Sequence, residues 1–467
     1  MDVKNLKVKD IRKGLKGGDF SCKELINEYL KTIKKDDKEI SAFLEITEDL
    51  ALSQAKKVDE GEFPNGKLAG VPVMVKDNIL VKDEKATAGS KILEHFRAPH
   101  DATVTKKIKE AGAVIVGKGN MDEFAMGGST ENSAFFPTKN PKDTTRVPGG
   151  SSGGPAAAVA SGMVPISLGS DTGGSIRQPA SFCGVVGFKP SYGRVSRNGL
   201  MSMASSLDQI GPFSKNVADA RLVFDIIKGK DEKDATSLEV EENYEKIKDF
   251  KVGVPKEYFV KGVDNQIKEA VEKELEKIKK SGVEVVNISL PHTEYALACY
   301  QIIMASEVSA NMARYDGIRY GLETDRPEAE SIEEAYKKNR GKFGDEVKRR
   351  IILGTFALSS GYYDDYYMKA EKVRELIRRD FDEAFKNVDV IVTPTSPIPP
   401  FKLGEKVEDP LSMYLADLFT TPANLAGLPA ISIPCRAEGL PVGLQIMGER
   451  FEDEKLLQIS EEIEKII

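Results

Sequence analysis

The sequence predicts an α/β protein organised around a central β-sheet. Short apolar segments that end at Gly, Pro or Asp are typical of buried strands, and segments with helical periodicity separate several of them. Strands that alternate with helices in this way indicate an α/β architecture. The predicted strands are Val71–Val75, Ala113–Val116, Val252–Val254, Val283–Ile288, Val388–Val392 and Gly443–Ile446.

Two stretches carry clear helical signals. Ser21 and Glu24 have the spacing of a capping box, in which each side chain bonds to the other residue's backbone N–H group. An apolar stripe at helical spacing follows this pair, at Leu25, Ile26, Tyr29, Leu30 and Ile33. A second stripe precedes the strand predicted at 283–288 and consists of Ile267, Val271, Leu275 and Ile278.

The length of 467 residues fits one large α/β domain, or two or three units of ordinary size. We predict a single domain over residues 1–467, with N-terminal helices at 1–65 and a catalytic core at 66–228. Residues 296–390 carry long helical patterns rich in Tyr, Arg and Glu. This last segment is predicted to form a helical insertion, or cap, near the substrate pocket.

Composition and charge argue against several classes of protein. A net charge of −7 and a pI near 5.5 disfavour a chain that grips a phosphate backbone by itself, because that affinity comes mainly from Lys and Arg. The charged N-terminal residues lack the apolar core of a signal peptide, and no stretch is apolar for long enough to span a bilayer. The four cysteines occur singly, without a Cys/His cluster. We therefore predict a cytoplasmic protein with no metal or other cofactor of its own.

The chain has only three histidines, and none stands beside a serine in a G-x-S-x-G motif. A histidine-based catalytic triad is therefore poorly supported. Two glycine-flanked serine loops are present instead, PGGSSGG at 148–154 and SDTGGSIRQPA at 170–180. Glycines let a ligand approach the main chain, and consecutive N–H groups can hold an anion such as the oxyanion of acyl transfer. The predicted oxyanion donors are the backbone N–H groups of Thr172, Gly173, Gly174 and Ser175.

A serine hydroxyl needs an adjacent base to act as a nucleophile near neutral pH. Lys76 follows the predicted strand at 71–75, so its ammonium group is expected to be poorly solvated. Burial disfavours the charged form of lysine, and a pKa shift from about 10.4 to near 7 corresponds to roughly 4–5 kcal/mol. We predict Lys76 as the neutral base, although a strand-end lysine that reaches water is the commoner situation.

The motifs KDN (76–78), PGGSSGG and GSDTGGSIRQPA resemble, in this order, those of the amidase signature family, and the resemblance runs through almost the whole chain. It implies a mixed central β-sheet covered by helices on both faces. It also implies that Ser175 forms the acyl-enzyme and that Ser151 relays a proton between Ser175 and Lys76. The family further places a cis peptide bond before Ser151.

Within the family, the segments at 305–321, 346–367 and 413–435 look like the A subunits of tRNA-dependent glutamyl/aspartyl amidotransferases. This resemblance implies glutamine as the substrate. Glutamine carries a carboxylate and an ammonium group, so a selective pocket needs a cation and an anion.

The substrate-binding residues are assigned from the same resemblance. Arg350, or its neighbour Arg349, is expected to hold the carboxylate, and Asp417 is expected to hold the ammonium group. Tyr300 is expected near the substrate. The loop at 126–133 is expected to contribute polar groups, including those of Gly127 and Ser129.

The resemblance also implies an assembly with B and C subunits, a heterotrimer. Ammonia would pass to the B subunit, which converts Glu-tRNA(Gln) to Gln-tRNA(Gln) and would bind ATP, Mg²⁺ and most of the charged tRNA. The sequence leaves open whether Glu-tRNA or Asp-tRNA is the acceptor. Two other functions remain open: a free-standing amidase for another small amide, and a non-catalytic scaffold.

Overall fold

The computed structural model describes residues 2–241, 247, 249–259, 262–321, 331–407, 409–436 and 438–467. The strands in this part of the chain are β1 (Phe43–Ile46), β2 (Pro72–Lys76), β3 (Val114–Gly119), β4 (Ile166–Asp171), β5 (Val186–Lys189), β6 (Gln209–Ser214), β7 (Lys251–Pro255), β8 (Glu284–Ile288), β9 (Val390–Pro394), β10 (Ala430–Pro434) and β11 (Gly443–Gly448). They form one sheet with the order β1-β3-β2-β4-β6-β5-β10-β11-β9-β7-β8. Parallel and antiparallel pairs both occur, as in β2 with β4 and β4 with β6, so the sheet is mixed.

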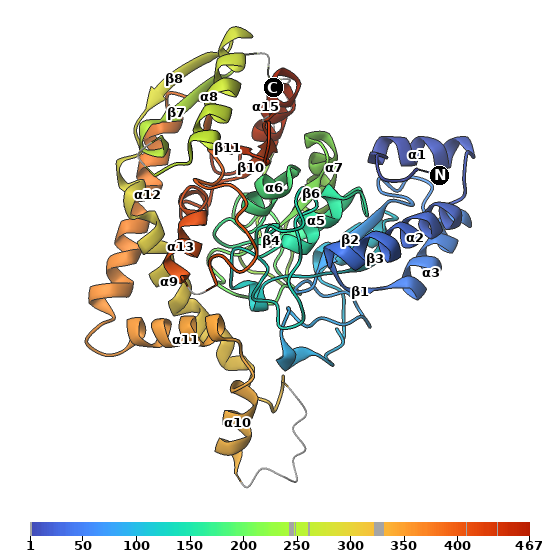
Figure 1. The fold of residues 1–467 in the computed structure, drawn as a ribbon, viewed down its shortest axis with the longest axis horizontal. Helices are drawn as coiled ribbons and strands as arrows, with labels where there is room; N and C mark the ends of the chain where they lie inside the picture. The colour runs from blue at the N-terminus through green and yellow to red at the C-terminus, as the bar shows by residue number, and fades with distance from the viewer. Residues whose placement is uncertain are drawn as a thin grey trace.

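Helices cover both faces of this sheet (Figure 1). The helices in the described part of the chain are α1 (Val8–Gly17), α2 (Cys22–Ile40), α3 (Glu48–Asp59), α4 (Thr103–Glu110), α5 (Gly153–Ala160), α6 (Arg177–Cys183), α7 (Val217–Ile227), α8 (Asn265–Lys280), α9 (Ala296–Asn311), α10 (Ile332–Arg340), α11 (Asp345–Leu358), α12 (Lys369–Phe385), α13 (Pro410–Tyr414), α14 (Thr421–Leu425) and α15 (Asp453–Ile466). Apolar residues of α2, α3 and α5 pack with Met74, whereas those of α4, α7 and α15 pack with Val73 and Val75. Because successive strand residues point to opposite faces, these two cores lie on opposite sides of β2. The predicted fold class is confirmed.

The predicted elements are present with small differences at their ends. Helix α2 follows Ser21, whose Oγ accepts from the Glu24 N–H at 3.1 Å, while the Glu24 carboxylate accepts from the Ser21 N–H at 2.8 Å. This is the predicted capping box. The six predicted strands correspond to β2, β3, β7, β8, β9 and β11.

Five strands were not predicted, and β4 and β6 explain why. Their sequences, ISLGSD and QIGPFS, contain Gly, Ser, Asp or Pro, residues that are depleted in strands. Both strands are fully buried, and they pair with each other from Ile166↔Ser214 to Asp171↔Gln209. Tertiary pairing thus overrides a weak local preference. The other unpredicted strands are β1, β5 and β10.

The segment 296–390 contains helices α9 to α12, with residues 322–330 outside the described part. Figure 1 shows α9, α11 and α12 at the end of the molecule opposite α1 to α3. The division of the chain into the segments 1–65, 66–228 and 296–390 stays a prediction.

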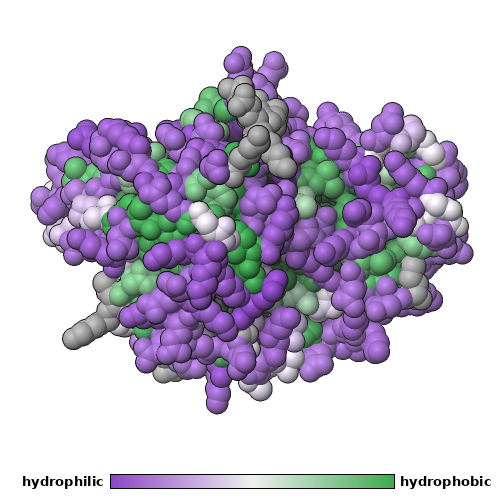
Figure 2. All heavy atoms as spheres, turned by 90° about the horizontal axis from the view of Figure 1, so that it is seen from above, coloured by the Kyte–Doolittle hydropathy of each residue, from purple (hydrophilic) through white to green (hydrophobic). Residues whose placement is uncertain are grey.

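Hydrophilic residues predominate on the face drawn in Figure 2, with apolar residues in patches between them. Among the helices of the described residues, none combines the length and the apolar character that crossing a membrane requires. The four cysteines are free thiols.

Candidate active site

The end of β2 brings Lys76 to the centre of the candidate site. β2 and β4 run parallel, with Val75 beside Leu168, so their carboxyl ends meet at one edge of the sheet. Lys76 is fully buried there. Its Nζ donates to the Oγ of Ser151 at 2.8 Å and to the Oγ of Ser170 at 2.9 Å. The amine thus contacts the serine of the first glycine loop.

Burial lowers the pKa of Lys76 to about 7, while the charges of Asp122, Asp171 and Asp208 act in the opposite direction. Lys189 has a similarly low pKa of about 7, also through burial. Its Nζ, however, donates to the carbonyl oxygens of residues 190 and 428. Burial alone therefore does not single out a base; the contact with a serine hydroxyl does.

The first serine loop leads into α5 and contains a cis peptide bond between Gly150 and Ser151. The carbonyl oxygen of Ser151 accepts from the N–H of Asp122 at 3.2 Å. Gln178 bridges two loops: its Oε1 accepts from the Gly150 N–H at 3.0 Å, and its Nε2 donates to the Gly128 carbonyl oxygen at 2.9 Å. The loop is therefore held by side chains on both sides.

The second serine loop, residues 172–175, connects β4 to α6. Ser175 is 7% exposed, and its hydroxyl forms no hydrogen bond to another described residue. No hydrogen bond to the described part of the chain is formed by the backbone N–H groups of residues 172–175 either. Such donors are available for an oxyanion. Ser151 and Ser175 do not share a hydrogen bond in this structure, so the predicted proton relay is not closed.

Close packing requires glycine at two positions of this loop. A Cβ on Gly173 would lie 2.5 Å from the ring of Tyr300, and Gly174 has a φ of +150°. The hydroxyl of Thr420 donates to the Gly173 carbonyl oxygen at 2.6 Å. Tyr300 and Thr420 thus hold this part of the loop in place.

A buried ion pair braces the second loop, and the sequence analysis assigned no role to either partner. The Nη2 of Arg177 lies 3.0 Å from Oδ1 of Asp171, and Asp171 Oδ2 accepts from the Ile176 N–H at 3.1 Å. Burial acts to raise the pKa of Asp171, but Arg177, together with Lys189 and Asn424, lowers this pKa to about 2. Both residues belong to the motif at 169–180, so the motif itself was the available signal.

Replacing Arg177 with Met is expected to lower the free energy of unfolding by about 3–5 kcal/mol, because Asp171 would remain buried without its counter-ion. Urea unfolding measures this change. The matched control is Arg378→Met, which breaks a half-exposed pair with Glu375 and is expected to cost less than about 1 kcal/mol. If the two substitutions lowered the free energy of unfolding equally, the buried ion pair would not stabilise the second loop as described.

Two of the predicted substrate residues contact the second loop. The ring of Tyr300 lies against Gly173, and a Cβ on Gly174 would lie 3.0 Å from Oδ1 of Asp417. The Oδ1 of Asp417 is buried and has no hydrogen-bond partner in the described structure, while the residue as a whole is partly exposed. Burial, followed by the charge of Asp171, raises the pKa of Asp417 to about 8. An unpaired buried carboxyl group is a receptor for a cationic ligand group.

Arg350 is buried, whereas Arg349 is exposed: their side chains are 6% and 42% accessible. The Nε of Arg350 donates to Glu346 at 2.8 Å, and its charge acts on the pKa values of Tyr300 and Asp417. Burial acts to lower the pKa of Arg350, but the Glu346 carboxylate, together with Tyr300 and Tyr414, raises this pKa. Arg350 therefore lies with Tyr300 and Asp417, and Glu346 is a partner that the sequence analysis missed.

Gly127 and Ser129 line a hollow of about 370 Å³, together with Glu346, Arg349 and Tyr414. Gly127 also packs closely against Asp122, which would lie 2.3 Å from a Cβ at this position. The loop at 126–133 therefore borders both the first serine loop and an open surface hollow.

The histidines lie away from these serines. His95 and His100 are exposed, and the Nδ1 of His292 lies 2.9 Å from Asp380. Within the described ranges, no group of three or more His, Cys, Asp or Glu side chains is arranged to hold a metal ion.

Comparison with known proteins places this geometry in a family. The amidase family matches residues 24–457. The A subunit of a glutamyl-tRNA(Gln) amidotransferase from Koribacter versatilis is 52% identical over 478 residues, which cover 99% of this chain and 99% of the relative. A relative of the same name from Natranaerobius thermophilus is also 52% identical, over 100% of this chain and 96% of the relative.

Solved structures support the same family. The crystal structure of the A subunit of a glutamyl-tRNA(Gln) amidotransferase from Thermotoga maritima has a TM-score of 0.83 and 44% identity, and covers 100% of this chain and 95% of its own. A bacterial aryl acylamidase of the amidase signature family has a TM-score of 0.86 and 25% identity, with coverages of 100% and 97%. The family match over most of the length and the full-length relatives together establish that the chain belongs to the amidase signature family.

Proposed function

We propose that this chain is the glutamine-hydrolysing subunit of a tRNA-dependent amidotransferase. The observation that carries the proposal is the buried hydrogen bond of 2.8 Å from Lys76 Nζ to Ser151 Oγ, beside a loop with unused backbone N–H groups. The relatives at 52% identity, which are named as A subunits of glutamyl-tRNA(Gln) amidotransferases, support the choice of glutamine.

In the first half-reaction, Ser175 Oγ forms a bond to the side-chain amide carbon of glutamine. The Ser175 proton passes to Ser151, whose own proton passes to the neutral amine of Lys76. The carbonyl oxygen becomes an oxyanion, which the N–H groups of residues 172–175 stabilise. The carbon–nitrogen bond then breaks as the amide nitrogen takes a proton back through Ser151, and ammonia leaves.

In the second half-reaction, water replaces ammonia. Its proton moves by the same route to Lys76 while its oxygen bonds to the acyl carbon. The bond to Ser175 Oγ breaks, Ser175 regains a proton, and glutamate is released. Each half-reaction returns Lys76 to its neutral form, so a lysine pKa near 7 suits both directions of proton transfer.

Substrate selection would use the buried cation of Arg350 and the carboxylate of Asp417, whose Oδ1 is buried. Arg350 would bind the α-carboxylate of glutamine through N–H donors that Glu346 leaves free, because a guanidinium has five of them. Asp417, whose Oδ1 is unpartnered, would accept from the α-ammonium group. That ammonium group would in turn stabilise the ionised form of Asp417.

The ammonia would pass to a B subunit that converts Glu-tRNA(Gln) to Gln-tRNA(Gln), with a C subunit completing a cytoplasmic heterotrimer. The names of the relatives support a multi-subunit enzyme. ATP, Mg²⁺ and most of the contact with charged tRNA would belong to the B subunit. Purification of the tagged chain from its host with two further subunits tests this assignment.

Ammonia release from glutamine, compared with simple aliphatic and aryl amides, tests the substrate. We expect a clear preference for glutamine. Equal or faster hydrolysis of an aryl amide would favour a free-standing amidase, a function suggested by the likeness to the aryl acylamidase. A fluorophosphonate probe that fails to label Ser175 would instead favour a non-catalytic scaffold.

Arg350→Ala is expected to raise the KM for glutamine by about 10- to 100-fold, because a charged hydrogen bond to the carboxylate is lost. Steady-state ammonia assays measure this change. Arg349→Ala is the matched control, since its side chain is exposed, and a KM within about twofold of wild type is expected for it. The reverse pattern would assign the carboxylate to Arg349.

A further inference from the structure

Helix α1 carries a row of basic side chains that the proposed mechanism does not use. Lys9, Arg12, Lys13 and Lys16 have the spacing i, i+3, i+4 and i+7, which places them on one face of the helix. Ile11 and Gly14 are buried on another side. We call these four basic residues the basic face of α1.

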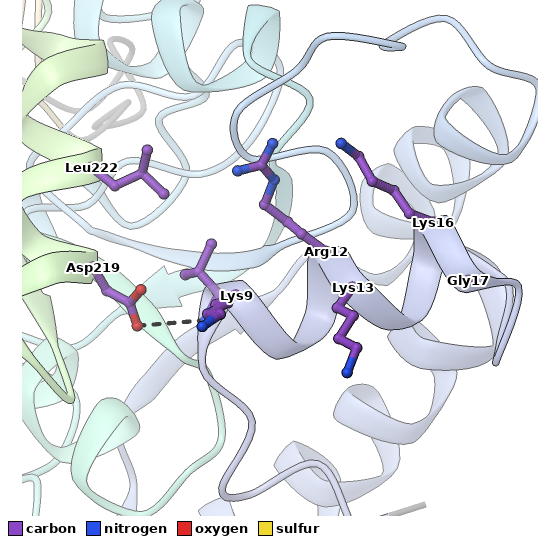
Figure 3. Close-up of a pocket in the computed structure, with 8 residues that line it drawn as sticks. Lys9, Arg12, Lys13, Lys16, Gly17, Asp219 and Leu222 are labelled. Atoms are coloured by element: carbon purple, nitrogen blue, oxygen red, sulfur yellow. Dashed lines mark hydrogen bonds between the residues drawn. The ribbon is translucent and has the colours of Figure 1, made fainter.

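The basic face borders a hollow of about 590 Å³ between α1 and α7. Figure 3 shows the side chains of Arg12 and Lys16 extending from the same side of α1 and that of Lys13 extending the other way, with Asp219 and Leu222 of α7 across from the helix. Asp219 is buried and already accepts from the Val8 N–H at 3.5 Å and from the Asn216 amide at 2.8 Å. The carboxylate of Asp219, the acidic residue of the hollow, therefore already has hydrogen-bond partners within the protein.

No described residue neutralises the charges of the basic face. Among the described residues, none makes an ion pair or a side-chain hydrogen bond with any of the four. In α10, by contrast, Lys337 pairs with Glu333 at 2.6 Å, and Lys338 pairs with Glu334 at 3.1 Å. A chain with a net charge of −7 thus keeps a local concentration of unpaired positive charge.

The composition of this surface indicates the chemistry of its partner. Protein interfaces have apolar or aromatic centres and are depleted in Lys. The apolar side chains that line the hollow are Val8, which is buried, and Leu222, which is half-buried, so none of them is a large exposed apolar side chain. Long cationic side chains about 5–6 Å apart along a helix suit a chain of phosphates, which Lys and Arg bind without reading sequence.

We propose that the basic face of α1 binds the phosphate backbone of RNA, and that this RNA is the charged tRNA of the amidotransferase. The choice of tRNA rests on the proposed function, whereas the phosphate-binding surface follows from the geometry of α1. This chain would then contact the tRNA directly and add to the binding supplied by the B subunit.

Binding of a fluorescently labelled tRNA transcript to the full chain, measured by anisotropy between about 50 and 200 mM salt, tests the proposal. The variant is Lys9→Gln/Lys13→Gln/Lys16→Gln. The matched control is Lys273→Gln/Lys279→Gln/Lys280→Gln, which removes three exposed lysines from α8, a helix that also carries several glutamates. Both variants should keep the melting temperature and glutaminase activity of wild type.

We expect the α1 variant to bind tRNA at least about tenfold more weakly at 50 mM salt, with a salt slope lower by about 2. The control should stay within about twofold of wild type. Absence of tRNA binding by the wild-type chain at 50 mM salt, or equal binding by the α1 variant, would overturn the proposal. So would an α1 variant that keeps RNA binding but no longer assembles with partner subunits, because the face would then be a protein contact. Loss of the proposed function would show separately, as a wild-type chain that binds tRNA but releases no ammonia from glutamine.

Discussion

Replacing Ser175 with Ala is expected to abolish ammonia release from glutamine, with kcat falling by at least about 10⁴-fold. The change removes one buried hydroxyl, which bonds to no other described residue, so the fold should be unaffected. Without it no acyl-enzyme can form, and only binding and oxyanion stabilisation remain.

The control for this experiment is Ser161→Ala. Ser161 lies just after α5, and its hydroxyl donates to the Ala157 carbonyl oxygen, away from the site. This variant should keep wild-type turnover. Mass spectrometry of a quenched reaction should detect a glutamyl adduct on wild type and none on the Ser175 variant. Turnover within tenfold of wild type in Ser175→Ala would refute the nucleophile assignment.

Replacing Lys76 with Ala is expected to lower kcat by several orders of magnitude, because the base and the later proton donor are the same group. Lys76→Arg separates charge from basicity: it keeps a cationic donor beside Ser151, but a guanidinium does not lose its proton in proteins. We expect both variants to be inactive. Activity in Lys76→Arg would mean that the site needs a positive charge rather than a base.

The pH dependence of the wild-type enzyme follows from the same group. The neutral amine is the reactive form, and the pKa of Lys76 is lowered to about 7, so titration of Lys76 alone should raise kcat/KM tenfold per pH unit below 7 and have no effect above it. Asp417, with a pKa of about 8, adds a second rise that continues to about pH 8, because its ionised form favours substrate binding. Asp417→Asn should remove that second contribution and leave the rise near pH 7.

The central fold could be predicted where apolar periodicity was strong. The continuous apolar run of β2 and the helical spacing of apolar residues in α2 each predict one kind of element, and both elements are present. Strand β6 contains Pro212 and was not predicted; it is held by long-range pairing with β4 and β5, which no local pattern encodes.

The candidate site, too, could be predicted only in part from the sequence. The glycine loops and Lys76 stand out in the sequence because their residue types are unusual in those positions. Ser170, which shares the amine of Lys76 with Ser151, was given no role although it lies within the motif at 169–180. Glu346 carries no such signal: only the packing of α11 against its neighbours shows that this charged helix has a buried face.

A direct titration of Lys76 tests the account most closely. NMR of the lysine side chains in the inactive Ser175→Ala variant, with the Lys76 resonance assigned by its loss in Ser175→Ala/Lys76→Met, measures the pKa of this amine. We predict a midpoint near pH 7, with the neutral amine prevailing above it. A midpoint near the ordinary lysine value of 10.5 would contradict the proposed base.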